Sequence, residues 1–223
     1  MWNYIPVQSL TEHLLEQGLA DRVLSERQLD RAVGGPAARR YGLVNRALKA
    51  HELIRIRRGL YVLEPRYRTE APHPFAIAQA LAPGSYVSFE TALAHHGWIP
   101  EATRVTANVV PGRKSSAYEH GTLGSFTFHP LALDPERFLE LIEREQLAAQ
   151  TALIAHPIRA LMDLVCLRKL SWQGLRWLTQ GMRIDLENLR SVTHEQIDIL
   201  TGVYKQKRPR QFLSAFANEL PRD

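Results

Sequence analysis

The stretch that most constrains the fold of this chain is RIRRGLYVL, residues 55–63. Apolar residues alternate with arginines ahead of Arg57-Arg58-Gly59, and the apolar pattern resumes after it, as in two half-buried strands. Glycine readily adopts the positive φ that a tight hairpin turn needs. The sequence therefore predicts strands LIRI (53–56) and LYVL (60–63), with Gly59 in the turn. We expect the hairpin to pack on neighbouring helices through four apolar positions, Ile54, Ile56, Leu60 and Val62.

Three helical patterns precede this hairpin. The first, residues 7–18, has one apolar face, made of Val7, Leu10, Leu14 and Leu15. The second, SERQLDRAVGG, begins at Ser25, which can cap the helix with Gln28 as its capping-box partner. The turn Gly34-Gly35-Pro36 follows, and AARRYGLVNRALKAHEL (37–53) then predicts a third helix. Helix, helix, tight turn, helix and hairpin is the order of a winged helix-turn-helix.

The third helix has two distinct faces. At about 100° per residue, the predicted core arc consists of Ala37, Tyr41, Val44 and Leu48. Three cations lie on roughly the opposite arc with Asn45 beside them: Arg39, Arg46 and Lys49. A helix of this width fits the DNA major groove, where guanidinium groups can bind guanine edges and an amide can bind adenine. Leu43 also falls on the outer side, which indicates either a contact with a thymine methyl or a shifted helix register.

The basic charge is concentrated in the same region. Residues 31–68 carry ten Lys/Arg and two Asp/Glu, whereas residues 69–223 carry 16 of each. Such a block favours a polyanionic partner, although a basic run can also be an ordinary solvated face. We expect the hairpin arginines to contact phosphates or the adjacent minor groove. The predicted DNA-binding residues are Arg39, Arg40, Asn45, Arg46, Lys49, Arg55, Arg57 and Arg58.

Several other classes of protein are not favoured. No apolar run approaches the roughly 20 residues of a membrane span, and the start lacks the pattern of a secretory signal, so we expect a cytoplasmic protein without a membrane partner. The only cysteine, Cys166, is expected to be a buried thiol. Histidines lack the HxxxH or HxH spacing of metal sites, and His95-His96 suits a helix end. We therefore predict no catalytic residues, no metal, no cofactor and no enzymatic activity.

The rest of the chain predicts an α+β domain, residues 72–223, with a small sheet and a helical C-terminal tail. It follows a winged-helix domain of residues 1–68 and a charged, proline-bearing linker. The predicted helices are 74–81, 89–96 and 156–167. Asp134-Pro135 favours a further helix start, but the sequence leaves open whether residues 135–146 form a helix or a strand. Arg159 and Asp163 lie four residues apart and could pair. The predicted strands are 86–88, 104–110, 125–131 and 148–155. Residues 111–124 are predicted to form a long polar loop. From Ser171 to Leu220 we expect helices, with interruptions near Gly181 and Pro209.

Three sequence blocks carry a resemblance to a known family. RRGLYVL, LAPGSYVSFETALAHHGWIP and IAHPIRALMDLV together resemble the AbiEi antitoxins of type IV toxin–antitoxin systems. The third block departs at His156-Pro157-Ile158-Arg159, where the family usually has an acidic residue before the arginine. The resemblance implies a winged-helix autorepressor that binds operator DNA and opposes a nucleotidyltransferase-like toxin, with the antitoxic activity in the C-terminal domain.

Two alternatives of other classes stay open beside this reading. One is a stand-alone winged-helix regulator that senses a ligand in its C-terminal domain. The other is a nucleic-acid-processing enzyme that uses the winged helix for targeting. The sequence also leaves open whether the protein binds DNA as a homodimer and whether it contacts a toxin directly.

Overall fold

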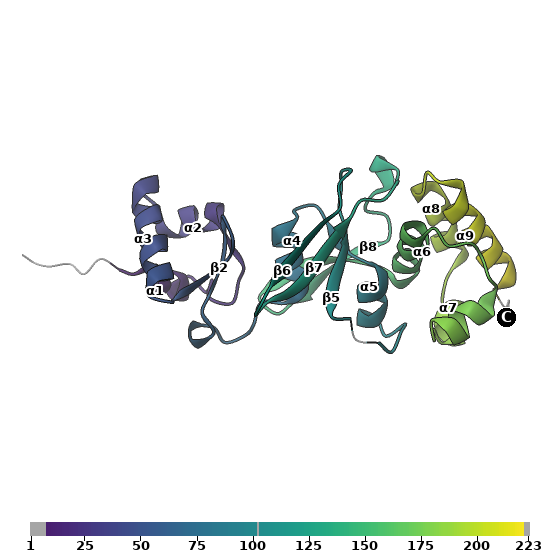
Figure 1. Cartoon of the computed structure of the whole chain (residues 1–223), viewed down its shortest axis with the longest axis horizontal. Coiled ribbons are helices and arrows are strands. Elements are labelled where there is room, and N and C mark those ends of the chain that lie inside the picture. Colours follow the sequence, from purple (N-terminus) through teal and green to yellow (C-terminus); the bar gives the residue numbers. More distant parts are fainter. Residues whose placement is uncertain (1–7, 102, 221–223) are drawn as a thin grey trace, which may run out of the picture. The chain divides into compact units, whose positions relative to one another are not determined.

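The chain forms two compact units in a computed structural model, which describes residues 8–101 and 103–220 (Figure 1). One unit holds residues up to Leu81 together with Gln146–Thr151, and the other holds Ala82–Glu145 and residues from Ala152 onward. Helices combine with a three-stranded antiparallel sheet and a six-stranded mixed sheet, which confirms the predicted α+β class. The division into a domain of residues 1–68 and a domain of residues 72–223 stays a prediction.

The first unit begins with the predicted helices. They are α1 (Leu10–Glu16), α2 (Glu26–Val33) and α3 (Ala37–Lys49). The predicted capping box of α2 is confirmed, because the Gln28 amide donates to Ser25 Oγ and the Ser25 amide donates back to the Gln28 side chain. In α1, Leu10 and Leu14 are buried, but the predicted core residue Leu15 is 47% exposed. Val7 lies outside the described residues.

The predicted hairpin is also present. Strands β2 (Leu53–Arg57) and β3 (Leu60–Leu63) pair antiparallel, and β1 (Leu24–Ser25) pairs with the other edge of β3. Gly59 has the predicted positive φ of 82° in the turn. The residues that join the helices in one core cluster are Leu53, Tyr61 and Leu63. The prediction therefore chose the wrong face of the hairpin for packing on the helices. Ile56, Leu60 and Val62 are buried but lie outside this cluster, and Ile54 is only half-buried.

The predicted core face of α3 is wrong by about a quarter turn. Leu43, Val44 and Ala47 are buried, whereas Tyr41 is 71% exposed. Val44 belongs both to the predicted core face and to the face that is buried, so the spacing of apolar residues alone did not distinguish the two faces. Burying Leu43 gains its full transfer free energy of about 1.5–3 kcal/mol, while a buried tyrosine hydroxyl would need a hydrogen-bond partner. This settles the register question raised by Leu43 in favour of a shifted register.

The third helix is also shorter than predicted, and a small linker segment follows the hairpin. Helix α3 ends at Lys49, and His51 adopts a left-handed φ of 51°. After β3 come a 3-10 turn (Pro65–Tyr67) and α4 (Pro74–Leu81), a helix whose bounds match the prediction. The Asp21 carboxylate accepts hydrogen bonds from the Thr69 hydroxyl and from the amides of Thr69 and Glu70, and these bonds lower its pKa.

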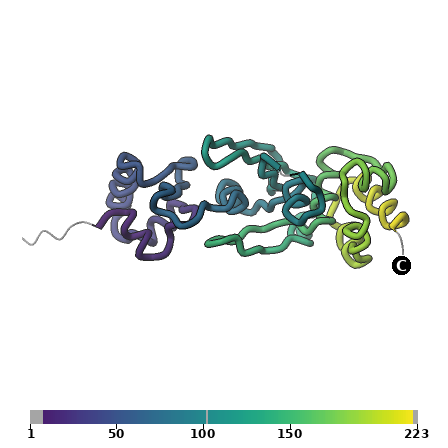
Figure 2. The backbone as a smooth tube through the Cα atoms, turned by 90° about the horizontal axis from the view of Figure 1, so that it is seen from below, coloured from purple at the N-terminus to yellow at the C-terminus, as the bar shows by residue number. Residues whose placement is uncertain are grey.

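The larger sheet has the strand order β6-β7-β5-β4-β9-β8. Its strands are β4 (Tyr86–Val87), β5 (Val105–Val109), β6 (Ser116–His120), β7 (Gly124–His129), β8 (Ile142–Leu147) and β9 (Gln150–Ala155). Strand β4 runs parallel to β9 and antiparallel to β5, while β5 runs parallel to β7. The hairpins β6–β7 and β8–β9 form the two edges, where Figure 2 shows them as separate arms.

One sequence prediction in this region is wrong, and the choice between helix and strand that the sequence left open over 135–146 is decided for its second half in favour of a strand. The stretch 111–124, predicted as a loop, contains β6, which pairs with β7 from Ser116 to His120. The helix start favoured at Asp134 leads only to a 3-10 turn, Pro135–Arg137, although Asp134 does accept a hydrogen bond from the Glu136 amide at 3.0 Å. Strand β8 then follows. Long-range strand pairing outweighs local preference in both places.

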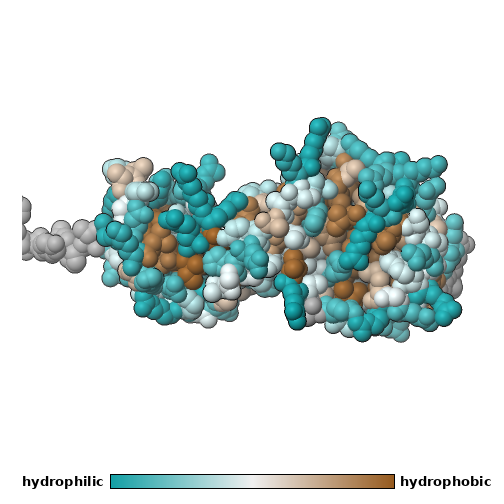
Figure 3. Space-filling view, viewed as in Figure 1, coloured by the Kyte–Doolittle hydropathy of each residue, from teal (hydrophilic) through white to brown (hydrophobic). Residues whose placement is uncertain are grey.

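The remaining helices belong to the second unit. They are α5 (Phe89–His95), α6 (Pro157–Arg168), a π-helical turn (Trp177–Gly181), α7 (Leu186–Arg190), α8 (His194–Val203) and α9 (Lys207–Glu219). Helix α5 packs on β5 and α6, and α9 packs on α6 and α8. The predicted interruption near Pro209 falls at Tyr204–Gln206, and Pro209 itself lies in the first turn of α9. Apolar residues show between hydrophilic side chains on the face seen in Figure 3. Among the described residues, no helix is long and apolar enough to cross a membrane.

A fully buried ion pair organises the core of the second unit. Arg159 Nε donates to Asp163 Oδ1 at 3.0 Å within α6, and both side chains are 0% exposed. Three hydroxyls donate to the same carboxylate, at 2.8–3.0 Å: those of Tyr86, Ser88 and Tyr204. Nearby, burial raises the pKa of the Cys166 thiol to about 11, which suits the predicted structural thiol.

Removing one partner of this pair should strongly destabilise the fold. Arg159→Leu leaves the Asp163 carboxylate buried without its counter-charge, and we expect a loss of about 3–5 kcal/mol in the free energy of unfolding. Arg168→Leu is a matched control on the same helix, because Arg168 forms a partly exposed pair with Glu90. That change should cost under about 1 kcal/mol. Urea unfolding of both variants measures the difference, and equal losses would contradict the structural role of Arg159.

Candidate nucleic-acid interface

A hollow of about 440 Å³ lies between α3 and the β2–β3 hairpin in the first unit. Four of the predicted DNA-binding residues line it: Arg40, Asn45, Arg55 and Arg58. Its other lining residues come from α2, α3 and β3, and they are Glu26, Leu29, Tyr41, Val44 and Tyr61. The tertiary structure thus brings the basic helix and the basic hairpin to one concave surface.

Local geometry places each of these side chains. Tyr41 and Asn45 lie one turn apart on α3 and therefore project from the same face. Arg55 lies opposite Tyr61 in the strand register, with its guanidinium carbon 6.0 Å from the centre of that ring. Such a contact restrains the arginine without neutralising it. Arg58 occupies the hairpin turn itself.

The hairpin turn is attached to the start of α2. The Glu26 amide donates to the Gly59 carbonyl at 3.1 Å. A Cβ built on Gly59 would lie 3.6 Å from the Glu26 side chain, an ordinary contact distance. The obstacle to other residues at this position is therefore the backbone conformation, not a lack of space.

The charges of the interface are mostly free to meet an anion. Six of the predicted cations are exposed to solvent: Arg39, Arg46, Lys49, Arg55, Arg57 and Arg58. Within the described part of the chain these six form no ion pair. Arg40 differs, because it pairs with Asp30. It is therefore the least available of the predicted phosphate contacts.

The hollow does not collect every predicted residue. Arg46 lines another hollow of about 350 Å³, with Ser9 and Glu52 among its neighbours. Arg39, Lys49 and Arg57 line neither hollow. The predicted DNA-binding surface thus extends beyond the hollow. Arg39, Arg46 and Lys49 extend it along α3, and Arg57 extends it along the hairpin.

Tyr41 is the residue of this site that the sequence interpretation missed. It was assigned to the core because it shares an apolar arc with Val44 and Leu48. Its 71% exposure instead makes it the most exposed large apolar side chain among those described. An aromatic residue between Arg40 and Asn45 on a basic helix was the available signal, since aromatic rings are frequent in nucleic-acid contacts.

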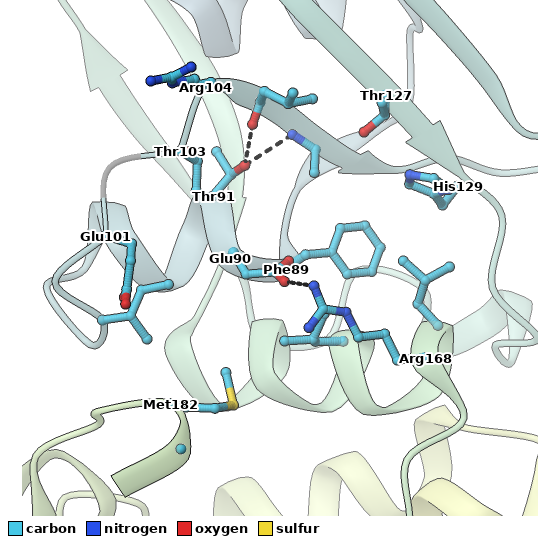
Figure 4. Close-up of a pocket in the computed structure, with 16 residues that line it drawn as sticks. Phe89, Glu90, Thr91, Glu101, Thr103, Arg104, Thr127, His129, Arg168 and Met182 are labelled. Atoms are coloured by element: carbon cyan, nitrogen blue, oxygen red, sulfur yellow. Dashed lines mark hydrogen bonds and ion pairs between the residues drawn. The ribbon is translucent and has the colours of Figure 1, made fainter. Parts of the chain in front are cut away.

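A second concave site lies within the other unit (Figure 4). Its volume is about 600 Å³, within the usual range for small-molecule sites. Glu90 and Arg168 form an ion pair on one side of it, and His129 packs edge-on against Phe89 with ring centroids 5.7 Å apart. Burial lowers the pKa of His129 and so favours its neutral form.

The wall of this pocket contains a strained residue. Phe89, at the start of α5, has a φ of 56°, which is unusual for a bulky side chain. Its neighbour Thr91 fixes the helix to β5 by donating to the Val105 carbonyl and accepting from the Ala107 amide, as the dashed lines in Figure 4 show. Strain of this kind is often found beside binding sites.

No family model matches the sequence of this chain, and no curated protein sequence matches it. The resemblance carried by the three sequence blocks therefore remains an expectation.

The positive φ of Gly59 yields a test of how the hairpin turn is built. Gly59→Val forces a β-branched residue into this conformation, and we expect it to destabilise the first unit by about 1–3 kcal/mol. Gly59→Asn is the matched control, because asparagine tolerates left-handed conformations and should cost clearly less. Thermal unfolding of the full chain compares the two. Equal stability of both variants would show that the turn does not depend on glycine.

Proposed function

We propose that the first unit is a winged helix-turn-helix and that the protein is a DNA-binding antitoxin, the autorepressor of a type IV toxin–antitoxin operon. In this proposal α3 is the recognition helix and the β2–β3 hairpin is the wing. The observation that carries it is the common basic surface of these two elements, with exposed cations around the hollow. The antitoxic role rests on the AbiEi resemblance and would oppose a nucleotidyltransferase-like toxin.

The chemistry of the surface suits duplex DNA. Asn45 is half-buried on α3 and lines the hollow, where its amide can donate and accept hydrogen bonds with an adenine edge in the major groove. Tyr41, beside it, offers an apolar ring for a thymine methyl. The exposed hairpin arginines Arg57 and Arg58 can neutralise phosphates, which positions the protein on DNA without reading its sequence.

A stand-alone regulator that senses a small ligand is a second candidate. The observation that favours it is the pocket of about 600 Å³ beside Phe89 and His129. The two candidates differ in what accompanies the gene. An adjacent reading frame for a nucleotidyltransferase-like protein supports the antitoxin, whereas DNA affinity that changes with a metabolite supports the regulator.

The wing assignment predicts a change in salt dependence. Arg57→Ala combined with Arg58→Ala removes phosphate contacts, so binding to promoter DNA and to random DNA should weaken to similar degrees. The slope of log affinity against log salt should flatten by about 0.9 per contact, up to roughly 2 for the pair. The measurement is titration onto both DNAs at several salt concentrations.

The control for this experiment removes the same charge elsewhere. Arg144→Ala combined with Arg190→Ala changes two exposed arginines of the second unit. This variant should keep the wild-type slope. If the Arg57/Arg58 variant also keeps it, the hairpin is not a DNA-contacting wing.

The two proposed activities should separate in the full-length chain. Arg39→Ala, Arg46→Ala and Lys49→Ala together should abolish specific binding to the protein's own promoter, because all three cations flank the exposed face of α3. Unfolding should stay near wild type, since these side chains are exposed. In co-expression with the cognate toxin, this variant should still restore growth. A triple variant that footprints the promoter normally would contradict the recognition-helix assignment, and failure to restore growth would contradict the division of roles.

A further inference from the structure

Three potential metal ligands converge where α5 ends. They are the imidazoles of His95 and His96 and the carboxylate of Glu145, and their ligand atoms all lie within 4.8 Å of one another. His95 Nε2 is 2.8 Å from Glu145 Oε2. We propose that these three side chains form a binding site for a divalent transition-metal ion of the zinc type.

The spacing of the donor atoms suits such an ion. In a tetrahedral zinc site with bonds of about 2.0–2.2 Å, donor atoms lie roughly 3.3 Å apart. The cluster therefore needs only side-chain adjustments to reach this geometry. The side chains of His95 and Glu145 are 26% and 28% exposed, so an ion can enter from solvent.

A backbone contact orients the second imidazole. His96 Nε2 lies 3.0 Å from the Ala155 carbonyl of β9, an acceptor, so this nitrogen carries the proton. The Nδ1 atom of His96 is then the unprotonated one, with its lone pair available for an ion. Histidines that bind metals usually donate their other ring nitrogen to a carbonyl or carboxylate in this way.

A third histidine close by has an unsatisfied nitrogen. His156 follows Ala155 in the chain, and the Ala155 carbonyl is the acceptor for His96. Its Nδ1 is buried and has no hydrogen-bond partner among the described residues. Buried polar atoms without a partner are rare and call for an explanation such as an ion or a water.

The donor set also indicates the kind of ion. Two imidazoles and one carboxylate favour zinc, copper or nickel over magnesium and calcium, which prefer oxygen ligands alone. One carboxylate offsets part of the charge of the ion. Three protein ligands leave a fourth position open for water.

Zinc titration of the full-length protein, purified without a histidine tag, tests the proposal. Calorimetry with ZnCl₂ and the visible absorption of bound Co²⁺ should report one site with an affinity in the micromolar range or tighter. Glu145→Gln and His96→Gln each remove a ligand, and each should weaken binding by at least the roughly 10–100-fold that loss of an outer-shell partner costs. Unfolding of the metal-free variants checks that the fold is retained.

The matched control is Glu143→Gln. It makes the same change of charge on the same strand, on an exposed residue outside the three-ligand cluster. Binding by this variant should weaken far less than binding by Glu145→Gln, because Glu143 lies near His96 but offers no ligand atom to the cluster. Equal weakening by Glu143→Gln and Glu145→Gln would reduce the effect to general attraction of cations, and absence of zinc binding to the wild type would overturn the proposal. Promoter binding by metal-free protein is measured separately, so failure here leaves the DNA-binding proposal untouched.

Discussion

The buried charge of Asp163 is the constraint on which the second unit depends. A carboxylate in a dry core is tolerated only when its hydrogen-bonding capacity is filled, and here the guanidinium of Arg159 and three hydroxyls fill it. Burial alone would lower the pKa of Arg159, but attraction to Asp163 outweighs it and the pKa is raised. Arg159 also donates to the Glu140 carbonyl at 2.8 Å. One cluster thus fixes α6 against β4, the segment before β8 and the end of α8.

This cluster gives a structural meaning to two of the three sequence blocks. Tyr86 and Ser88 come from the block around SYVSFE, and the ion pair comes from PIRALMD. The predicted pairing of Arg159 with Asp163 is confirmed, and both side chains are fully buried, which fits a role in holding the core. The candidate functional sites lie elsewhere: the basic hollow of the first unit, and the pocket and histidine cluster of the second.

In the first unit, stability and the proposed function depend on one arrangement of α3. Burial of Leu43, Val44 and Ala47 turns Tyr41 and Asn45 toward the hairpin arginines. A hydrogen bond from the Glu26 amide to the Gly59 carbonyl also holds the hairpin turn against α2. The same packing that forms the core of the unit thus sets the shape of its basic surface.

The sequence by itself determined the features that depend on neighbouring residues. These are the capping box of Ser25 and Gln28, the positive φ of Gly59, the bounds of α4 and the concentration of cations in residues 31–68. Tertiary structure decided between options of similar local energy. Examples are the buried face of α3, the pairing of β6 with β7 and the pairing of β8 with β9. It alone brought Glu145 to His95 and His96, because β8 and α5 meet through strand and helix packing that no local spacing encodes.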